Sequence, residues 1–388
     1  MNSFDFCSST ELVFGRGAEN SIGERLAARF PKGRVYLVYG GGSVKRTGLY
    51  DRVTGSLREA GLEVREKGGV RPNPDIGLIR ELSSDARNWG ADVLLAVGGG
   101  SVIDTCKAAA MAVPYGGDPW DFFSGKAKCV RALPIAVILT IPAAGSEQSM
   151  RVVVSNGDKK WGTASQLIRP MVSVIDPELF FTLPPYQAAA GVVDMMSHIM
   201  ERYFTNTPAT GFVDGQAEAA MRSIMKFGLE IRRDPRNYDA WSQVGVAGAF
   251  AHNGYYGLGQ EEDWASHGME HELSAWNPKI THGAGLAVVI PGFLAFTGAR
   301  RPERVAQWAR NVMGSVEQDD SAAVRDGIAR LRAFYREMGM PGSLEELGAG
   351  SAPLEELARR AARSGTLGHF VPLSPEDVLS IYRSVLKA

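Results

Sequence analysis

Two segments of the chain carry side chains that bind transition metals in proteins. Asp194 and His198 are four residues apart in an alanine- and methionine-rich stretch, and His267 and His271 repeat this spacing. On a helix, residues four apart lie on one face, one turn from each other. His282 follows a turn signal and begins an apolar run. The spacing therefore predicts one aspartate and several histidines near the ends of separate helices.

The ordinary explanation of an Asp-x3-His pair is an ion pair on an exposed helix surface, and one such pair argues for nothing more. This chain has only six histidines, however, and four of them fall in the pattern, namely His198, His267, His271 and His282. One carboxylate with several imidazoles suits a divalent transition metal, either Fe²⁺ or Zn²⁺. The clustering predicts a metal site, on the condition that the fold brings the two segments together.

A glycine turn lies where a predicted strand, 91–97, passes into a predicted helix that begins at 102. The turn, Gly98-Gly-Gly-Ser101, exposes backbone N–H groups at the positive end of the helix, where a phosphate can approach closely. On that helix Lys107 is placed to pair with a phosphate, and Asp104 to accept a hydrogen bond from a ribose hydroxyl or a nicotinamide amide. The spacing is not G-x-G-x-x-G. Three glycines after a strand also build an ordinary tight turn, so both interpretations stay open.

A second turn, Gly40-Gly-Gly-Ser43, follows the predicted strand 35–39. Sites that select NAD usually place an acidic residue here to bind the ribose 2′-hydroxyl. This chain has glycines, Ser43 and then Lys45 and Arg46, which suit the additional 2′-phosphate of NADP. The turn therefore favours NADP(H) over NAD(H), and the alternative is a solvent-exposed basic start of a helix.

Strands and helices alternate in the first half of the chain, and helices alone fill the second half. Short runs rich in β-branched and aromatic residues predict strands, and their alternation with helices predicts a parallel sheet covered on both faces. We expect an α/β nucleotide-binding domain over 1–180 and an all-helical metal-binding domain over 181–388. The predicted strands are 35–39, 62–64, 91–97, 135–139, 151–155 and 171–175. The predicted helices of the second domain are 186–204, 209–231, 237–256, 264–275, 283–298, 302–314, 320–338, 354–364 and 375–386.

Composition narrows the class of protein. The chain has 388 residues, 45% hydrophobic and 22% charged, with a net charge of -1, which is typical of a soluble enzyme and gives no reason to expect a nucleic-acid or membrane partner. Neither a signal peptide nor an apolar run long enough to span a membrane is evident. Three scattered cysteines are too few for a disulfide framework, so we expect a cytoplasmic location.

In combination, these motifs resemble those of the iron-containing, or group III, alcohol dehydrogenases. The similarity extends over nearly the whole chain, from Leu12-Val-Phe-Gly-Arg-Gly17 to Pro375-Glu-Asp-Val378. Within that family the chain is most similar to the NADP(H)-dependent butanol dehydrogenase and aldehyde reductase branch. The motifs that carry the resemblance are Tyr39-Gly-Gly-Gly-Ser-Val-Lys45, Gly98-Gly-Gly-Ser-Val-Ile-Asp104-Thr-Cys-Lys107, Gly145-Ser-Glu147, Asp194-x3-His198, Asp263-Trp-Ala-Ser-His267, His267-x3-His271 and His282-Gly283.

The resemblance implies an N-terminal Rossmann-like domain, an all-α C-terminal domain and a metal in the cleft between them, which is the dehydroquinate synthase-like arrangement. It also implies a homodimer, and it places His271 near the nicotinamide, where it supports the metal ligands or relays a proton. The implied metal ligands are Asp194, His198, His267 and His282. The implied cofactor-binding residues are Gly98, Gly99, Gly100, Ser101, Asp104, Thr140 and Lys160, with Gly41, Gly42 and Ser43 around the adenosine 2′-phosphate.

The chain departs from the family pattern at three places. Ala144 stands where the family often has a threonine, so one hydroxyl near the cofactor is lost. The residues after Glu147, Gln148-Ser-Met-Arg151, are bulkier than expected. The interval from His267 to His282 is one residue longer than usual, which bears on the placement of His282 and on the shape of the substrate pocket.

We expect reversible, metal-assisted hydride transfer between NADP(H) and a primary alcohol or aldehyde. A polyol or glycerol dehydrogenase and a sugar-phosphate cyclase are alternatives with the same fold, although a cyclase needs basic residues where Met195-Met196 and Ala275-Trp276 are apolar. His267-Gly-Met-Glu270-His271 also fits the H-x-x-E-H pattern of zinc hydrolases, with Glu270 as general base. A hydrolase has no use for two phosphate-binding turns. A non-catalytic protein with a degenerate site is disfavoured by the retention of all four candidate ligands.

Overall fold

The computed structural model describes residues 1–387. The chain forms two compact units. One is Cys7–Thr182, and the other consists of Met1–Phe6 together with the chain from Leu183 onward. The division into functional domains at residue 180 stays a prediction.

The first unit is built on a six-stranded parallel sheet in the order β1-β8-β5-β4-β2-β3. Its central strands are buried on both faces because their sequences are almost wholly apolar, as parallel strands between two layers of helices require. The predicted sheet is confirmed. The strands are β1 (Glu11–Phe14), β2 (Arg34–Tyr39), β3 (Glu63–Lys67), β4 (Val93–Gly98), β5 (Ile135–Leu139) and β8 (Val172–Ile175).

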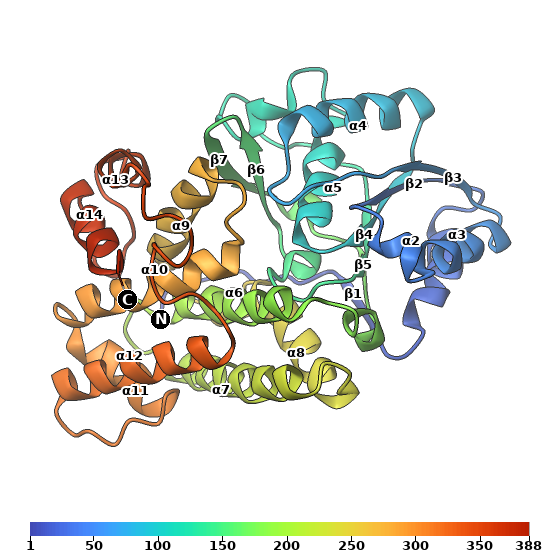
Figure 1. The fold of residues 1–388 in the computed structure, drawn as a ribbon. Coiled ribbons are helices and arrows are strands. Elements are labelled where there is room, and N and C mark those ends of the chain that lie inside the picture. Colours follow the sequence, from blue (N-terminus) through green and yellow to red (C-terminus); the bar gives the residue numbers. More distant parts are fainter. Residues whose placement is uncertain (388) are drawn as a thin grey trace. The chain divides into compact units, whose positions relative to one another are not determined.

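Helices cover both faces of this sheet (Figure 1). Alternate residues of a strand point to opposite faces, and in β2 Val35 and Leu37 join one core cluster with Leu26 and Val53. Tyr36 points the other way, where its hydroxyl donates to Asp85 at 2.5 Å. Leu26, Val53 and Asp85 lie on α1, α3 and α4. The helices of this unit are α1 (Ile22–Arg29), α2 (Ser43–Arg46), α3 (Leu49–Glu59), α4 (Ile76–Trp89) and α5 (Gly100–Ala112).

Two strands were not predicted from the sequence. One is β1, at the edge of the sheet. The other is β7 (Lys159–Ala164), which pairs antiparallel with β6 (Arg151–Asn156) in a separate two-stranded sheet. The β7 sequence is polar and partly exposed, so it lacks the apolar run by which the other strands were recognised. The predicted strand at 151–155 therefore exists but belongs to a hairpin outside the main sheet.

The second unit is helical in the part of the chain that the structure describes, and all nine predicted helices are present. The largest difference is at the end of α8, which stops five residues before the predicted position because the chain turns through Gly254, whose φ is 99°. These helices are α6 (Pro185–Tyr203), α7 (Gly211–Arg233), α8 (Tyr238–Ala251), α9 (Ala265–Trp276), α10 (His282–Gly298), α11 (Pro302–Asn311), α12 (Asp320–Glu337), α13 (Leu354–Ala361) and α14 (Pro375–Ser384). Over the described residues, none of the helices is both long and apolar enough to cross a membrane.

Helices α6 and α10 form the centre of this unit, and both are buried for most of their length. Their contact is close because Gly283, in the first turn of α10, lies directly against the carbonyl of Ala190. A Cβ atom at Gly283 would stand 2.0 Å from that carbonyl oxygen. The absent side chain thus allows the start of α10, and with it His282, to approach the middle of α6.

Substitution of Gly283 by alanine should lower the stability of the protein by about 1–3 kcal/mol, because the added methyl group forces the two helices apart. Urea unfolding measures the change. Gly215→Ala is the matched control, since Gly215 is also helical, in α7, and nothing lies within 4 Å of its added Cβ. We expect that control to be neutral or slightly stabilising. An unchanged urea concentration at the midpoint of unfolding for Gly283→Ala would contradict the close contact between Gly283 and the Ala190 carbonyl.

Candidate metal centre and nucleotide-binding turns

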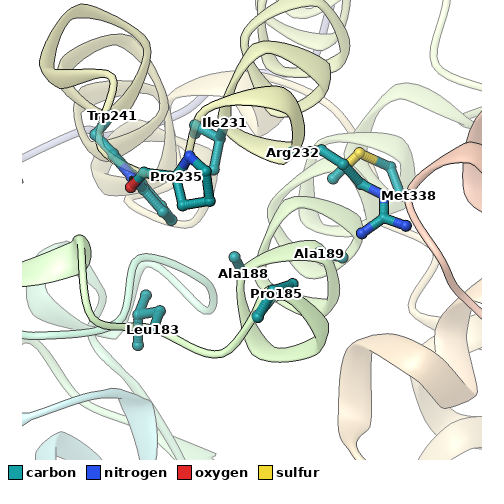
Figure 2. A pocket seen from close by; sticks show the side chains of 9 residues that line it. All are labelled: Leu183, Pro185, Ala188, Ala189, Ile231, Arg232, Pro235, Trp241 and Met338. Carbon is teal, nitrogen blue, oxygen red and sulfur yellow. Dashed lines mark hydrogen bonds between the residues drawn. The ribbon is translucent and has the colours of Figure 1, made fainter.

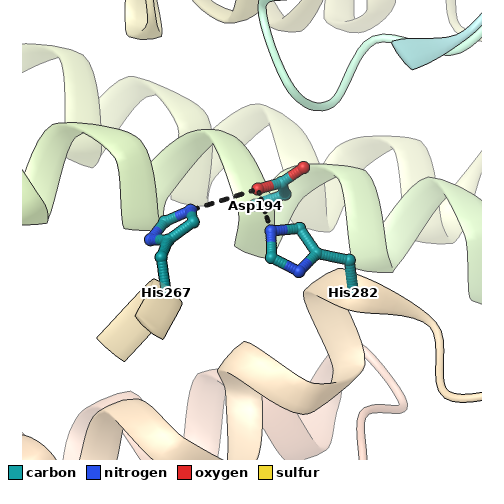
Figure 3. A group of neighbouring side chains, drawn as sticks. All are labelled: Asp194, His267 and His282. Atoms are coloured by element: carbon teal, nitrogen blue, oxygen red, sulfur yellow. Dashed lines mark ion pairs between the residues drawn. The ribbon is translucent and has the colours of Figure 1, made fainter. Parts of the chain in front are cut away.

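Three helices of the second unit direct the predicted metal-binding residues toward one point. Helix α6 carries Asp194 and His198, α9 carries His267, and His282 is the first residue of α10. Figure 3 shows the imidazoles of His267 and His282 pointing at the carboxylate of Asp194. Because residues four apart share a helix face, His198 lies beside the same carboxylate.

The Oδ1 atom of Asp194 is the common neighbour of all three imidazoles. It lies 3.3 Å from His198 Nδ1, 3.6 Å from His282 Nε2 and 3.9 Å from His267 Nε2. Ligand atoms of Asp194, His267 and His282 all lie within 4.8 Å of one another. His198 touches the aspartate but does not belong to that group of three. The longer interval before His282 has therefore not removed this histidine from the cluster.

These residues fit a divalent metal ion. In the described chain, Asp194 Oδ1, His198 Nδ1 and His267 Nε2 are buried atoms without a hydrogen-bond partner, and such atoms are costly to bury unless something binds them. Four ligands at about 2.0–2.1 Å in a tetrahedron lie roughly 3.3 Å apart. The three distances from Asp194 Oδ1 are equal to that value or slightly longer, while His198 lies outside the group of three whose ligand atoms are all mutually close. The donors, one carboxylate oxygen and imidazole nitrogens, are those that Zn²⁺ and Fe²⁺ accept.

The charges of the cluster affect the candidate ligands differently. Burial by itself would raise the pKa of Asp194, but the nearby imidazoles of His198, His282 and His267 hold it below its ordinary value. Burial lowers the pKa of His198 well below its usual range, which keeps this ring in the neutral form that binds metals. Burial also acts to lower the pKa of His267, but Asp194 and Glu201 outweigh it and raise that pKa to about 9. A proton therefore competes with a cation for His267.

Two buried carboxylates contact the far sides of the histidine rings. Glu201 Oε1 lies 2.8 Å from His267 Nδ1, and Glu270 Oε2 contacts His282 Nδ1. Glu201 was not predicted from the sequence, and Glu270 was predicted only as the general base of a hydrolase. The spacing held a signal, because Glu201 lies seven residues after Asp194, about two helical turns, on the same face of α6.

The other two histidines near the cluster differ in role. His271 lies one turn beyond His267 on α9, with its ring 5.3 Å from that of His282, and its part in proton transfer stays a prediction. The ring of His252 packs 4.1 Å from that of His198, and its Nδ1 lies 3.2 Å from Arg202 Nη2. His252 is thus a packing residue behind His198.

The predicted nucleotide-binding turns lie at the carboxyl ends of three neighbouring strands of the first unit. Gly98 ends β4, Thr140 follows β5, and the turn 40–43 follows β2. The backbone N–H of Thr140 donates to the carbonyl of Gly98 at 3.0 Å, so these two positions are adjacent. This edge is where open α/β sheets bind their ligands. Helix α5 begins at Gly100, which leaves its first N–H groups available to a phosphate.

Lys107 does not have the role that the sequence suggested. It is fully buried, and its ammonium group donates to Ser146 Oγ, the Ser149 carbonyl and the Arg151 carbonyl at 2.8–2.9 Å. An ammonium group has three hydrogens, so none is left for a phosphate, and the prediction that Lys107 pairs with phosphate is wrong. Burial lowers its pKa to about 8 although Asp104 opposes the shift. Lys107 instead ties α5 to the start of the β6–β7 hairpin.

Asp104 and Ser146 belong to the same network. Asp104 accepts hydrogen bonds from Ser146 Oγ at 2.5 Å and from the backbone N–H of Val153 at 2.9 Å. Ser146, of the Gly145-Ser-Glu147 motif, therefore bridges Asp104 and Lys107. Lys160 lies on β7 of this hairpin, and its positive charge acts to lower the pKa of Asp104, which burial raises. Whether Asp104 and Lys160 also contact a cofactor stays a prediction.

The turn after β2 has an acidic neighbour, Glu66, that was not predicted from the sequence. Lys45 Nζ lies 3.7 Å from Glu66 Oε1, on β3, and 4.6 Å from the centre of the Tyr50 ring. The side chain of Lys45 is nevertheless half exposed. The ammonium group of Lys45, which we predicted near a 2′-phosphate, is thus accessible to solvent, but the carboxylate of Glu66 lies beside it.

A small pocket in the helical unit is a poor candidate for a substrate site. It holds about 20 Å³ and is lined mainly by apolar side chains of α6, α7 and α8, with Trp241 and Ile231 among them (Figure 2). Arg232 is the charged residue in its lining, and its Nε donates to the carbonyl of Glu337. The volume suffices for a single water molecule.

Comparison with known proteins settles the family. The model of the iron-containing alcohol dehydrogenases matches residues 9–177, and that of the C-terminal region of the Fe-containing alcohol dehydrogenase family matches residues 188–386. The chain belongs to the iron-containing alcohol dehydrogenase family. The recognition made from the sequence motifs is therefore confirmed.

Three members of this family illustrate the similarity. The NADH-dependent butanol dehydrogenase A of Clostridium acetobutylicum is 39% identical over 99% of both chains. The NADPH-dependent aldehyde reductase YqhD of Escherichia coli is 34% identical over 94% of both chains. The crystal structure of NADH-dependent butanol dehydrogenase A from Thermotoga maritima superimposes with a TM-score of 0.96 at 34% identity, covering 100% of this chain and 99% of that one.

Substitution of Lys107 by methionine should lower the stability of the protein by about 2–3 kcal/mol, because the backbone carbonyls of Ser149 and Arg151 lose their buried donor. Urea unfolding measures this loss, and Lys126→Met provides an exposed lysine of the same unit as control. A Lys107 that bound the phosphate of NADPH would give a different result. Unchanged stability with a much weaker affinity for NADPH would overturn the structural role of Lys107.

Proposed function

We propose that this protein catalyses reversible hydride transfer between NADP(H) and a primary alcohol or aldehyde, assisted by one Fe²⁺ or Zn²⁺ ion. The observation that carries the proposal is the convergence of Asp194 and three imidazoles on one point in a member of the iron-containing alcohol dehydrogenases. The names of the two relatives described above, a butanol dehydrogenase and an aldehyde reductase, support the same substrate class.

In this proposal, Asp194, His198, His267 and His282 hold the metal. A bound ion would supply Lewis-acid stabilisation to the oxygen of the aldehyde or alcohol, and a bound nicotinamide would supply or accept the hydride. Asp194 offsets part of the positive charge, and the neutral rings of the three histidines leave the rest of it for the substrate oxygen. His271 passes the alcohol proton toward solvent, which its half-buried position one turn from His267 permits.

The first unit binds the nucleotide in this proposal. The backbone of Gly98, Gly99, Gly100 and Ser101 at the start of α5 receives the pyrophosphate. Thr140, at the adjoining strand end, together with Asp104 and Lys160, contacts the remainder of the cofactor. Gly41, Gly42 and Ser43 leave room for the adenosine 2′-phosphate, with Lys45 beside them.

The alternatives are weaker. For the H-x-x-E-H hydrolase, Glu270 would have to activate a water molecule at the metal, whereas its carboxylate contacts His282 Nδ1, on the ring edge away from Asp194.

For a sugar-phosphate cyclase, basic groups should surround the ligands. In the sequence, Met195 and Met196 are apolar flanks that argue against a cyclase. Both side chains are fully buried, so they do not distinguish a cyclase from a dehydrogenase. A polyol or glycerol dehydrogenase differs only in substrate, so an assay against glycerol separates it. Assembly as a homodimer in the cytoplasm stays a prediction.

Purified protein should contain about one divalent metal ion per chain, and His267→Ala should lose it together with turnover. Loss of a Lewis acid removes several kcal/mol of transition-state stabilisation, so kcat/KM for butanal should fall about a hundredfold or more. Elemental analysis and NADPH oxidation measure the two effects. His369→Ala is the control because the side chain of His369 is 60% exposed and its Nδ1 lies 3.6 Å from Glu261 Oε1, outside the set of predicted ligands. Full metal content in His267→Ala would exclude His267 as a ligand.

The choice of cofactor has its own test, because the names of the relatives include both NADH and NADPH. The double variant Lys45→Ala with Arg46→Ala should raise KM for NADPH about tenfold, since a lost charge contact to phosphate costs roughly 1–2 kcal/mol, and should leave KM for NADH nearly unchanged. Arg58→Ala, an exposed arginine of the same unit, is the control. Equal KM values for the two cofactors in the unaltered enzyme would refute the NADP(H) preference.

A further inference from the structure

Two glutamates outside the expected ligand set are built into the candidate metal centre. Glu201 is 2% exposed and lies on α6, and Glu270 is fully buried on α9. Each contacts the Nδ1 atom of a different predicted ligand, Glu201 that of His267 and Glu270 that of His282. The same contact thus occurs twice, from different helices, at different histidines.

These contacts determine which ring nitrogen faces the cluster. A carboxylate oxygen accepts hydrogen bonds, so the Nδ1 of each ring donates, and in the neutral ring that binds a metal the Nε2 then has the lone pair. The Nε2 atoms of His267 and His282 are the ones that point to Asp194 Oδ1, at 3.9 and 3.6 Å. Glu201 and Glu270 therefore hold both rings in the tautomer and orientation that ligation by Nε2 needs.

The glutamates are themselves fixed in place. Glu201 Oε1 accepts a second hydrogen bond from the backbone N–H of His267 at 2.9 Å, so one oxygen secures both the ring and the start of α9. Glu270 is accommodated because Gly285 has no side chain, and a Cβ there would lie 2.7 Å from Glu270 Cγ. Both carboxylates are consequently rigid supports for the rings rather than exposed groups that happen to lie nearby.

We propose that Glu201 and Glu270 are positioning residues that set the affinity of the site for a divalent cation. They orient His267 and His282, and their two negative charges, added to that of Asp194, stabilise a doubly charged ion in a buried place. This inference rests on the metal site of the proposed function. It explains why both carboxylates are buried against ligand histidines.

Metal affinity of the apoprotein tests the role without relying on turnover. Glu201→Gln and Glu270→Gln keep the shape and an accepting oxygen but remove the charge, and Glu201→Ala removes both. Zn²⁺ affinity is measured by competition with a chelator, and the visible absorption of bound Co²⁺ reports the ligand geometry. Glu272→Gln is the matched control, because Glu272 is a buried glutamate of the same helix α9 that pairs with Arg360 at 2.7 Å instead of a histidine.

We expect Zn²⁺ to bind about 10- to 100-fold more weakly to each glutamine variant, and more weakly still to Glu201→Ala. The Co²⁺ spectrum should change in the Glu201 and Glu270 variants and stay the same in Glu272→Gln. Unaltered protein that binds neither ion at one per chain would defeat the metal site itself. Tight binding by the unaltered protein together with equal affinity in both glutamine variants would defeat only the positioning role. A loss of affinity in Glu272→Gln as large as in the others would assign the effect to general destabilisation of α9.

Discussion

The carboxylate of Asp194 is the group on which the candidate metal centre depends. A single oxygen, Oδ1, has imidazole nitrogens of three helices as neighbours, and burial deprives it of water. A cation that satisfies all of these atoms at once removes the cost of burying them. For this oxygen to have all of these neighbours, α6, α9 and α10 must pack against one another in one fixed arrangement. Gly283 makes this packing possible at the α6–α10 contact.

The predicted nucleotide-binding turns depend on a different physical principle. Their capacity to bind phosphate comes from backbone N–H groups at a helix start and from the absence of side chains, so no charged residue has to lie in the turn. This explains how Lys107, next to the turn in sequence, can serve the structure instead. Its buried ammonium group links helix α5 to the β6–β7 hairpin.

Membership of the iron-containing alcohol dehydrogenases establishes the fold and the chemical class more firmly than the cofactor. The butanol dehydrogenase of C. acetobutylicum is named for NADH and the reductase of E. coli for NADPH. A difference in cofactor preference has to arise from the residues around the adenosine ribose. The 2′-phosphate of NADP and the 2′-hydroxyl of NAD differ in charge and size but bind at the same strand end. In this chain Lys45 lies in that region, with Glu66 Oε1 3.7 Å from its ammonium group.

The sequence by itself determined the elements and most of the candidate ligands. Apolar runs marked the buried strands, helical periodicity marked α6 to α14, and the four-residue spacing placed Asp194 and His198 on one helix face, because each of these depends on neighbours close along the chain. Tertiary structure alone decided what happens between distant segments. It gave Lys107 three buried acceptors more than thirty residues away, paired polar β7 with β6, and placed Glu201 and Glu270 behind His267 and His282. Spacing along the sequence determines which side chains share one face of a helix. Tertiary packing determines which atoms of another helix those side chains contact.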